Sequence, residues 1–206
     1  MGRHSALLTA ILLATAALPR AASAEAKAPA GVTPAASLSN YFDLLDGGDV
    51  EAAVALCHAD DDGESHLALS LSTLGYGQRM CVRAIEQRFG EDGVRQTVGR
   101  PLGAKEAAAS KVAINGATAR LTLAGGASFP FVRVGGEWKL SMRELAGDYK
   151  LTPDQLARGF REMAQTYLLT AREVVDGKHK KPSDVNAALE KRGHRRATSA
   201  SDRRRD

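Results

Sequence analysis

Between Ser110 and Met142, the apolar residues of this 206-residue chain recur at every second position, and no other feature constrains the fold as strongly. Three residue pairs that favour tight turns divide the run: Asn115-Gly116, Gly125-Gly126 and Gly135-Gly136. A period of two with turns at this spacing is typical of antiparallel strands joined by hairpins. The sequence therefore predicts a four-stranded antiparallel meander, with Asn115-Gly116 at the tip of the first hairpin in a type I′ turn.

One face of this meander is apolar and the other is polar. In the second strand, for example, the apolar residues alternate with Thr118, Arg120 and Thr122. A sheet of this kind must bury its apolar face against other elements, and the segment before Ser110 has helical periodicity. The predicted buried face consists of Ala119, Leu121, Leu123, Phe129, Phe131, Trp138, Leu140 and Met142.

Four helical segments are predicted before the sheet. Glycines separate them, and Asp49 is expected to cap the second with its side-chain oxygen. The break between the third and fourth is expected at Gly75-Tyr76-Gly77, and the fourth is expected to stop at Gly90. The four segments are Leu38–Leu45, Val50–His58, His66–Leu74 and Gln78–Phe89.

A long amphipathic helix is predicted after the sheet. Thr152-Pro153-Asp154-Gln155 combines an N-cap, a proline in the first turn and a capping-box glutamine, and the apolar stripe continues to Gly177. A shorter helix, Asp184–Arg192, is expected to end at Gly193. The stripe could close the sheet or cover its outer face within one chain, or form a seam between two chains. Its width favours the intrachain role, and both a monomer and a homodimer remain open.

The first 24 residues have the three-part form of a secretory signal peptide: a short basic start, an apolar run and the cleavage site Ala22-Ser23-Ala24. The apolar run is shorter than the roughly 20 residues of a spanning helix, so we expect cleavage rather than a retained transmembrane anchor. The predicted location is periplasmic or extracellular, by the general secretory route. The predicted organisation is signal peptide 1–24, flexible leader 25–36, α+β domain 37–146, C-terminal helical extension 152–192 and disordered basic tail 193–206.

Charge divides the chain after Gly177. Residues 25–177 carry 16 Lys and Arg against 20 Asp and Glu, a net charge of −4, whereas residues 178–206 carry 10 against 4, a net charge of +6. A basic tail attracts anionic partners, and in an exported protein an anionic envelope component is the expected one. Nucleic acid is disfavoured, because stacking aromatics do not accompany the basic residues. The alternative is a solvated tail without a partner.

The densest polar segment runs from His58 to His66 and contains four acidic residues. Its spacing fits neither a calcium loop, because Ser65 stands where counting from Asp60 requires glycine, nor a zinc helix, because the histidines are eight residues apart. We therefore expect an exposed acidic turn, and the sequence predicts neither a metal site nor a cofactor.

Cys57 and Cys81 are the chain's 2 cysteines, and each falls in a predicted helix. Export makes a disulfide between them chemically permissible. The alternative is two buried free thiols, since free cysteine is among the most buried residue types.

Two segments carry a family resemblance. Residues 41–61, YFDLLDGGDVEAAVALCHADD, and residues 129–142, FPFVRVGGEWKLSM, resemble the nuclear transport factor 2-like superfamily, which includes polyketide-cyclase-like and ketosteroid-isomerase-like proteins. The resemblance covers about residues 36–145. It implies a curved sheet wrapped around helices into a cone, often with an apolar pocket at the open end. Family members include enzymes and binding modules, and the acidic and phenolic catalytic positions of the isomerases match no residues here.

The expected function is that of an exported, non-enzymatic binding or accessory module with a small apolar ligand in the cone. No catalytic residue is predicted, because the inward set of side chains suits a packed core or a lipophilic ligand better than acid/base chemistry. The alternatives are an isomerase- or cyclase-type enzyme in the same cone and an envelope protein that binds anionic polymers through its basic tail. The candidate pocket residues are Tyr41, Phe42, Tyr76, Leu121, Phe131 and Trp138.

Overall fold

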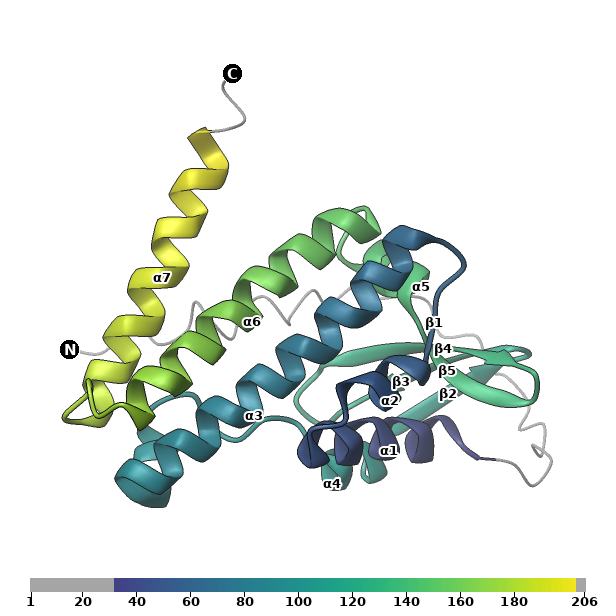
Figure 1. Ribbon diagram of the computed structural model, residues 1–206. Coiled ribbons are helices and arrows are strands. Elements are labelled where there is room, and N and C mark those ends of the chain that lie inside the picture. Colours follow the sequence, from purple (N-terminus) through teal and green to yellow (C-terminus); the bar gives the residue numbers. More distant parts are fainter. Residues whose placement is uncertain (1–31, 203–206) are drawn as a thin grey trace.

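The computed structural model describes residues 32–202, with side chains as far as Arg192 (Figure 1). This part of the chain is α+β, as predicted, and contains seven helices and five strands. The predicted signal peptide and residues 25–31 of the predicted leader lie outside the described residues. The leader was predicted to extend too far, because Thr33 caps α1 and the helix already begins at Pro34. The elements are α1 (Pro34–Gly47), α2 (Val50–Ala55), β1 (Cys57–His58), α3 (Asp62–Gln96), α4 (Ala104–Ala108), β2 (Lys111–Asn115), β3 (Thr118–Thr122), β4 (Ser128–Val134), β5 (Glu137–Ser141), α5 (Met142–Asp148), α6 (Pro153–Val175) and α7 (Pro182–Asp202).

The sheet is open and mixed, with strand order β1-β5-β4-β3-β2. Strands β2 to β5 pair antiparallel in sequence order, as predicted. The fifth strand was not predicted: Cys57 and His58 were assigned to the second helix, but they form β1, parallel to Leu140 and Ser141. The backbone groups along the edge of β5 would have no strand partner if α2 continued through Cys57 and His58. In the extended conformation this segment pairs with them, and the Leu140 N–H donates to the Leu56 carbonyl oxygen (3.0 Å).

The first hairpin is confirmed, but its turn type was predicted wrongly. Asn115 pairs with Thr118, so the two loop residues are Gly116 and Ala117. Gly116 has φ 58°, whereas Ala117 does not adopt a positive φ. A glycine with positive φ at the first loop position is the mark of a type II′ turn rather than type I′.

The third and fourth predicted helices form the single helix α3, because Gly75 and Gly77 serve close packing rather than a break. A Cβ on Gly75 would lie 2.6 Å from Cδ1 of Leu45 on α1, and a Cβ on Gly77 would lie 3.2 Å from the backbone oxygen of Ala164 on α6. Glycine lets both helices approach at these points. The departure from helical geometry lies instead at Gly90, which has φ 72° and is the expected stop of the fourth segment.

Helix α6 begins with the predicted capping box: the Thr152 N–H donates to Oε1 of Gln155 (3.0 Å), and the Gln155 N–H donates to Oγ1 of Thr152 (3.3 Å). The helix runs parallel to α3 and packs along it (Figure 1). Asp154 lies beside His66 at one end of the pair, and Gly177 lies beside Arg88 at the other. The apolar stripe is therefore buried within the chain, against α3 rather than against the outer face of the sheet.

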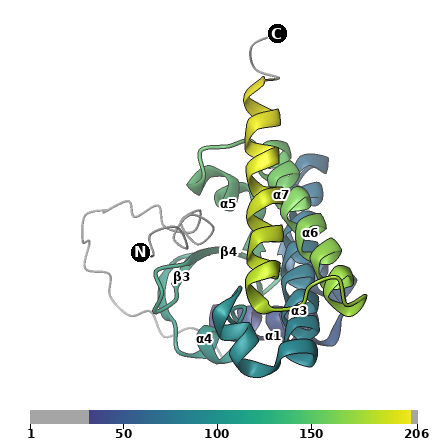
Figure 2. The ribbon, with the colours of Figure 1, turned by 90° about the vertical axis from the view of Figure 1, so that its left-hand side faces the viewer.

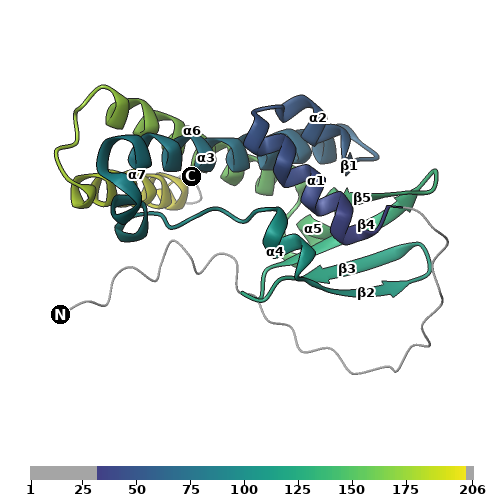
Figure 3. The ribbon, with the colours of Figure 1, turned by 90° about the horizontal axis from the view of Figure 1, so that it is seen from below.

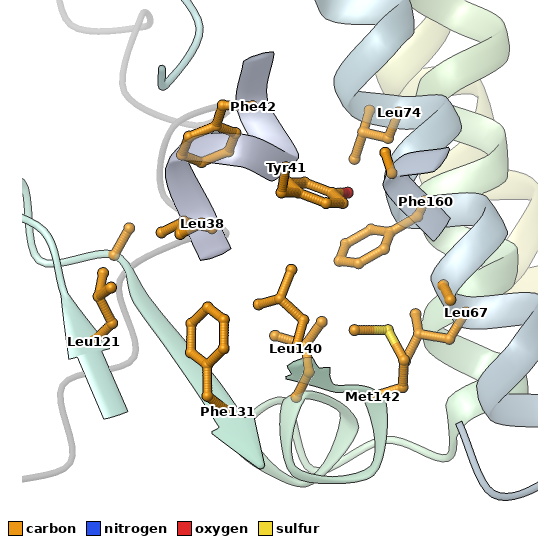
Figure 4. Close-up of a cluster of buried hydrophobic side chains, with 14 of the residues drawn as sticks. Leu38, Tyr41, Phe42, Leu67, Leu74, Leu121, Phe131, Leu140, Met142 and Phe160 are labelled. Atoms are coloured by element: carbon orange, nitrogen blue, oxygen red, sulfur yellow. The ribbon is translucent and has the colours of Figure 1, made fainter. Parts of the chain in front are cut away.

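Two hydrophobic clusters lie along this helix pair. The sheet-side cluster joins α1, α3, α5 and α6 to the sheet, and Figure 4 shows part of it. The helix-end cluster joins the far ends of α3 and α6 to α7, beyond the sheet (Figures 2 and 3), and Tyr167 packs against both clusters. The helix-end cluster consists of Cys81, Val82, Ala84, Ile85, Val94, Ala171, Val174, Val185 and Leu189.

Helix α7 runs to Asp202, nine residues past the stop predicted at Gly193. A glycine inside a helix costs about 1 kcal/mol relative to alanine, which the arginines and alanines around it can offset. The predicted disorder of the tail remains a prediction, since side chains beyond Arg192 and the whole of 203–206 lie outside the description. No helix within residues 32–202 has a stretch long and apolar enough to cross a bilayer.

Candidate functional site

The structure brings the six candidate pocket residues together in the sheet-side cluster. Tyr76 is partly buried at its margin, and the other five are between 0 and 5% exposed. Side chains with so little accessible surface contact one another instead of lining an open cavity. A ligand could reach them only if the helices moved away from the sheet. The residues lie on α1 (Tyr41, Phe42), α3 (Tyr76), β3 (Leu121), β4 (Phe131) and β5 (Trp138), and Figure 4 labels four of them.

Aromatic contacts connect the interior of this cluster with the sheet. The rings of Tyr41 and Phe42 meet edge to face at 5.8 Å between centroids, and Phe42 meets Phe129 of β4 at 6.1 Å. The Tyr41 hydroxyl lies 3.1 Å from Oγ of Ser72. Burial raises the pKa of Tyr41, so the group is a neutral phenol in this environment.

The inner face of the sheet bears the buried residues Ala119, Leu121 and Phe131, but at the edge strand β2 the residues of this face are exposed. Val112 and Ile114 of β2 pair with Leu121 and Ala119, and therefore point to the same side. Yet Val112 is 39% exposed and Ile114 is 44% exposed. We call Val112 and Ile114 the β2 rim. It continues the apolar inner face beyond the part that the helices cover.

Sequence analysis did not single out the β2 rim. The alternation Lys-Val-Ala-Ile-Asn assigned these residues to a strand, and the hairpin register places them on the apolar face. How far the helices extend over that face depends on the placement of α1, which no local pattern records. The signal that could have pointed to the rim is that β2 opens the meander and has one neighbouring strand.

The polar segment from His58 to His66 spans the end of β1, the turn that follows it and the start of α3. Asp61 caps the helix by accepting from the Glu64 N–H (2.8 Å), and Oε2 of Glu64 accepts from the Asp60 N–H (2.9 Å). Among the described residues, no group of three or more His, Cys, Asp or Glu side chains could hold a metal ion. In this structure Asp61 caps the helix, and Asp60 and Glu64 are ion-pair partners.

Arg143, which sequence analysis did not identify, connects this turn to the start of α5, the helix that follows β5. Its Nε donates to Oε1 of the buried Glu64 (2.8 Å), and its Nη2 lies 3.0 Å from Oδ2 of Asp60. Nε2 of His58 lies 3.0 Å from the other oxygen of Asp60. The hydrogen bond that Arg143 donates to Glu64 raises the pKa of Arg143, and this contact holds α3 and α5 together.

Both cysteines are free thiols, and they lie in different clusters. Cys57 is in β1 beside the sheet-side cluster, and Cys81 is fully buried in the helix-end cluster. The disulfide was considered on the expectation that Cys57 and Cys81 lie on two predicted helices packed side by side. Cys57 lies in β1 instead, and Cys81 lies in α3. Burial raises the pKa of each thiol to about 12, which keeps both protonated and unreactive at neutral pH.

Two arginines tie the helices together away from the sheet. Arg79 of α3 is buried, and it donates to Asp46 of α1 (2.7 Å) and to the Leu102 carbonyl oxygen (2.7 Å). Arg192 of α7 donates to both carboxylate oxygens of Glu173 (2.7 Å) and to Oγ1 of Thr170 (2.6 Å). These contacts fix α1 and α7 on the long helix pair.

A shallow hollow lies on α7, lined by Ala187, Ala188, Lys191 and Arg192. It is far from the candidate pocket residues and borders the part of α7 whose side chains are not described. It therefore does not supply the apolar pocket expected from the sequence.

Comparison with protein-family models, with curated proteins and with solved structures finds no match to the chain.

Proposed function

We propose that the protein is an exported, non-enzymatic binding or accessory module that holds an apolar ligand at the β2 rim. The observation that carries the proposal is the exposure of Val112 and Ile114 on the face that is otherwise the core of the protein. Leu121 and the partly buried Phe129 lie next to them on that face and extend it toward the interior. An apolar molecule placed there would complete the cover that the helices leave unfinished.

The rim sets the strength of such binding. Full burial of an aliphatic side chain contributes about 1.5–3 kcal/mol, and these two side chains are already more than half buried. Together they contribute about 2 kcal/mol, which is far below the roughly 8 kcal/mol of a micromolar complex. The ligand must therefore be large enough to contact Phe129 and the neighbouring surface as well, or bind weakly.

The side chains near the sheet that could act as acids, bases or nucleophiles support a binding role rather than an enzymatic one. Glu64 accepts a hydrogen bond from Arg143, and His58 contacts Asp60. The thiol of Cys57 is protonated. The alternative, an isomerase- or cyclase-type enzyme, requires an acidic or histidine side chain directed at the inner face. The charged side chain that the strand register places there is Arg133, which lies over the Trp138 ring at 5.9 Å.

Titration with an apolar fluorescent probe, N-phenyl-1-naphthylamine, tests this proposal. The double variant Val112→Thr/Ile114→Thr keeps the branched side chains but makes the rim polar, and we expect probe affinity to fall at least about fivefold, since roughly 1 kcal/mol of contact is lost. The matched control is Val175→Thr, because Val175 is 68% exposed on α6, away from the sheet. Equal affinity of the double variant and the control would contradict the proposal.

A further inference from the structure

The outer edge of β2 is a strand edge without a described neighbour. β2 is the last strand in the sheet order, all five of its side chains are exposed, and Figure 3 shows no described element beyond it. A two-residue loop makes Asn115 and Thr118 a hydrogen-bonded closing pair. Because such pairs alternate along an antiparallel ladder, Val112 and Ile114 direct their backbone N–H and C=O groups away from β3.

We infer that a second copy of this chain pairs with this edge, antiparallel, across a two-fold axis at Ala113. This inference rests on the proposed function, since it names a partner for the same β2 rim. In this register, Val112 faces Ile114 of the second copy, and the two residues exchange backbone hydrogen bonds in the directions they already point. The two rims then join into one apolar strip on the inner face of a continuous sheet.

The sequence of β2 suits a copy of itself. Directly opposed side chains share a face, so the apolar Val112 and Ile114 meet each other, and Lys111 meets the neutral Asn115 of the second copy. Parallel pairing in register would instead place the two Lys111 ammonium groups side by side. Charge and apolar complementarity therefore both select the antiparallel arrangement.

The edge also lacks the usual protection against pairing. Natural edge strands carry prolines, bulges or inward-pointing charges, whereas β2 has five regularly paired residues and a single lysine at its start.

Cysteine cross-linking measures both the pairing and its register. Residues opposed at a non-hydrogen-bonded position have Cα atoms about 4.5 Å apart, within the range of a disulfide, so Ala113→Cys is expected to link across the axis. The matched control, Lys111→Cys, lies on the same strand and face. Its two copies would be about 14 Å apart along the strand, too far for a disulfide. Both positions are exposed, so neither change should disturb the fold.

The experiment uses the full chain expressed with its own N-terminal segment, oxidised by copper-phenanthroline at micromolar protein concentration. We expect a disulfide-linked dimer from Ala113→Cys at a yield at least about fivefold above that from Lys111→Cys. The wild-type chain should give little cross-linked dimer, because Cys81 is buried and Cys57 is partly buried. Equal yields from both variants, or no dimer from Ala113→Cys, would overturn the inference.

The probe titration separates this inference from the proposed function. A cross-linked Ala113→Cys protein together with unchanged probe binding by Val112→Thr/Ile114→Thr would support the dimer and contradict the ligand. Loss of probe binding in that double variant, with no cross-link at position 113, would contradict the dimer and support the ligand.

Discussion

The two clusters along the α3–α6 pair are built differently. The sheet-side cluster contains buried aromatic rings from four elements, among them Phe42, Phe131, Trp138 and Phe160. The helix-end cluster contains aliphatic side chains and one thiol, and α7 contributes Val185 and Leu189 to it and the ion pair of Arg192. Large rings bury more area per residue than short aliphatic chains. The comparison indicates a stable sheet-side body and a more easily detached end, with the β2 rim as the margin of the stable part.

The largest expected effect is on the sheet-side cluster. Phe131 is 1% exposed, so Phe131→Ala should lower the free energy of unfolding by about 3–5 kcal/mol through lost burial and the resulting cavity. Urea denaturation followed by circular dichroism measures this loss. Val175→Ala, at an exposed position, should change it by less than about 0.5 kcal/mol. A similar small change for Phe131→Ala would show that the cluster is loosely packed.

The helix pair should respond to a single methyl group. In Gly77→Ala, the new Cβ would lie 3.2 Å from the Ala164 backbone oxygen and push α3 away from α6, which should cost about 1–3 kcal/mol. In Gly159→Ala, the new Cβ would meet no atom within 4 Å, and the exposed helical site should instead gain about 0.5–1 kcal/mol. Thermal unfolding of the two variants compares them, and the same sign for both would contradict the close packing described here.

The helix-end cluster should lose α7 first. Arg192→Met removes one partner of Glu173 and leaves its contact with His179, and since the Arg192 and Glu173 side chains are partly exposed, we expect a loss of about 1 kcal/mol or less. Faster trypsin cleavage at the lysines before α7 would report it. The control is Lys191→Met, which changes an exposed neighbouring residue. Equal protease sensitivity of the two variants would contradict an anchoring role for Arg192.

The same ion pair predicts a pH dependence. The hydrogen bond that Arg192 donates to Glu173 holds the pKa of Glu173 below its ordinary value of 4.5. The pair's contribution to stability is therefore complete above pH 4.5 and is lost as the pH falls through the lower pKa of the folded state. The protection factors of the α7 amides, which are corrected for the pH dependence of intrinsic exchange, should fall over that range in the wild type, and they should fall less in Arg192→Met. An identical pH dependence in both proteins would assign the effect to other groups.

The smallest effect on stability is expected at the β2 rim. Val112→Thr/Ile114→Thr changes exposed positions, so the free energy of unfolding measured at low protein concentration should stay within about 0.5 kcal/mol of the wild type. A loss of more than about 2 kcal/mol would show that the rim belongs to the core and would remove the contrast with Phe131.

The sequence allowed prediction of the elements whose signals are local. Strands β2 to β5 follow from alternation and turn glycines, and the start of α6 follows from the Thr152 capping box. The roles of Gly75 and Gly77 could not be predicted, because they depend on where Leu45 and Ala164 lie in space. In a sequence, glycine indicates a helix break. Its role in close helix packing becomes evident only when the position of the neighbouring helix is known.

The candidate site was predicted only in part, for a related reason. Alternation identified Leu121, Phe131 and Trp138 as inward-facing, and they are buried. Alternation alone could not say that the helices fill the space above these residues and leave Val112 and Ile114 uncovered. The pairing of Cys57 with β5 likewise depends on a contact across more than 80 residues of sequence.

The most direct test of the central claim, that the edge of β2 is an interaction surface, is residue-resolved amide exchange by nuclear magnetic resonance at two protein concentrations. We expect the Ala113 amide, which faces β3, to be protected at both concentrations. The Val112 and Ile114 amides should exchange rapidly in dilute protein and become protected in concentrated protein. Rapid exchange of Val112 and Ile114 at both concentrations would contradict the pairing of two copies through this edge.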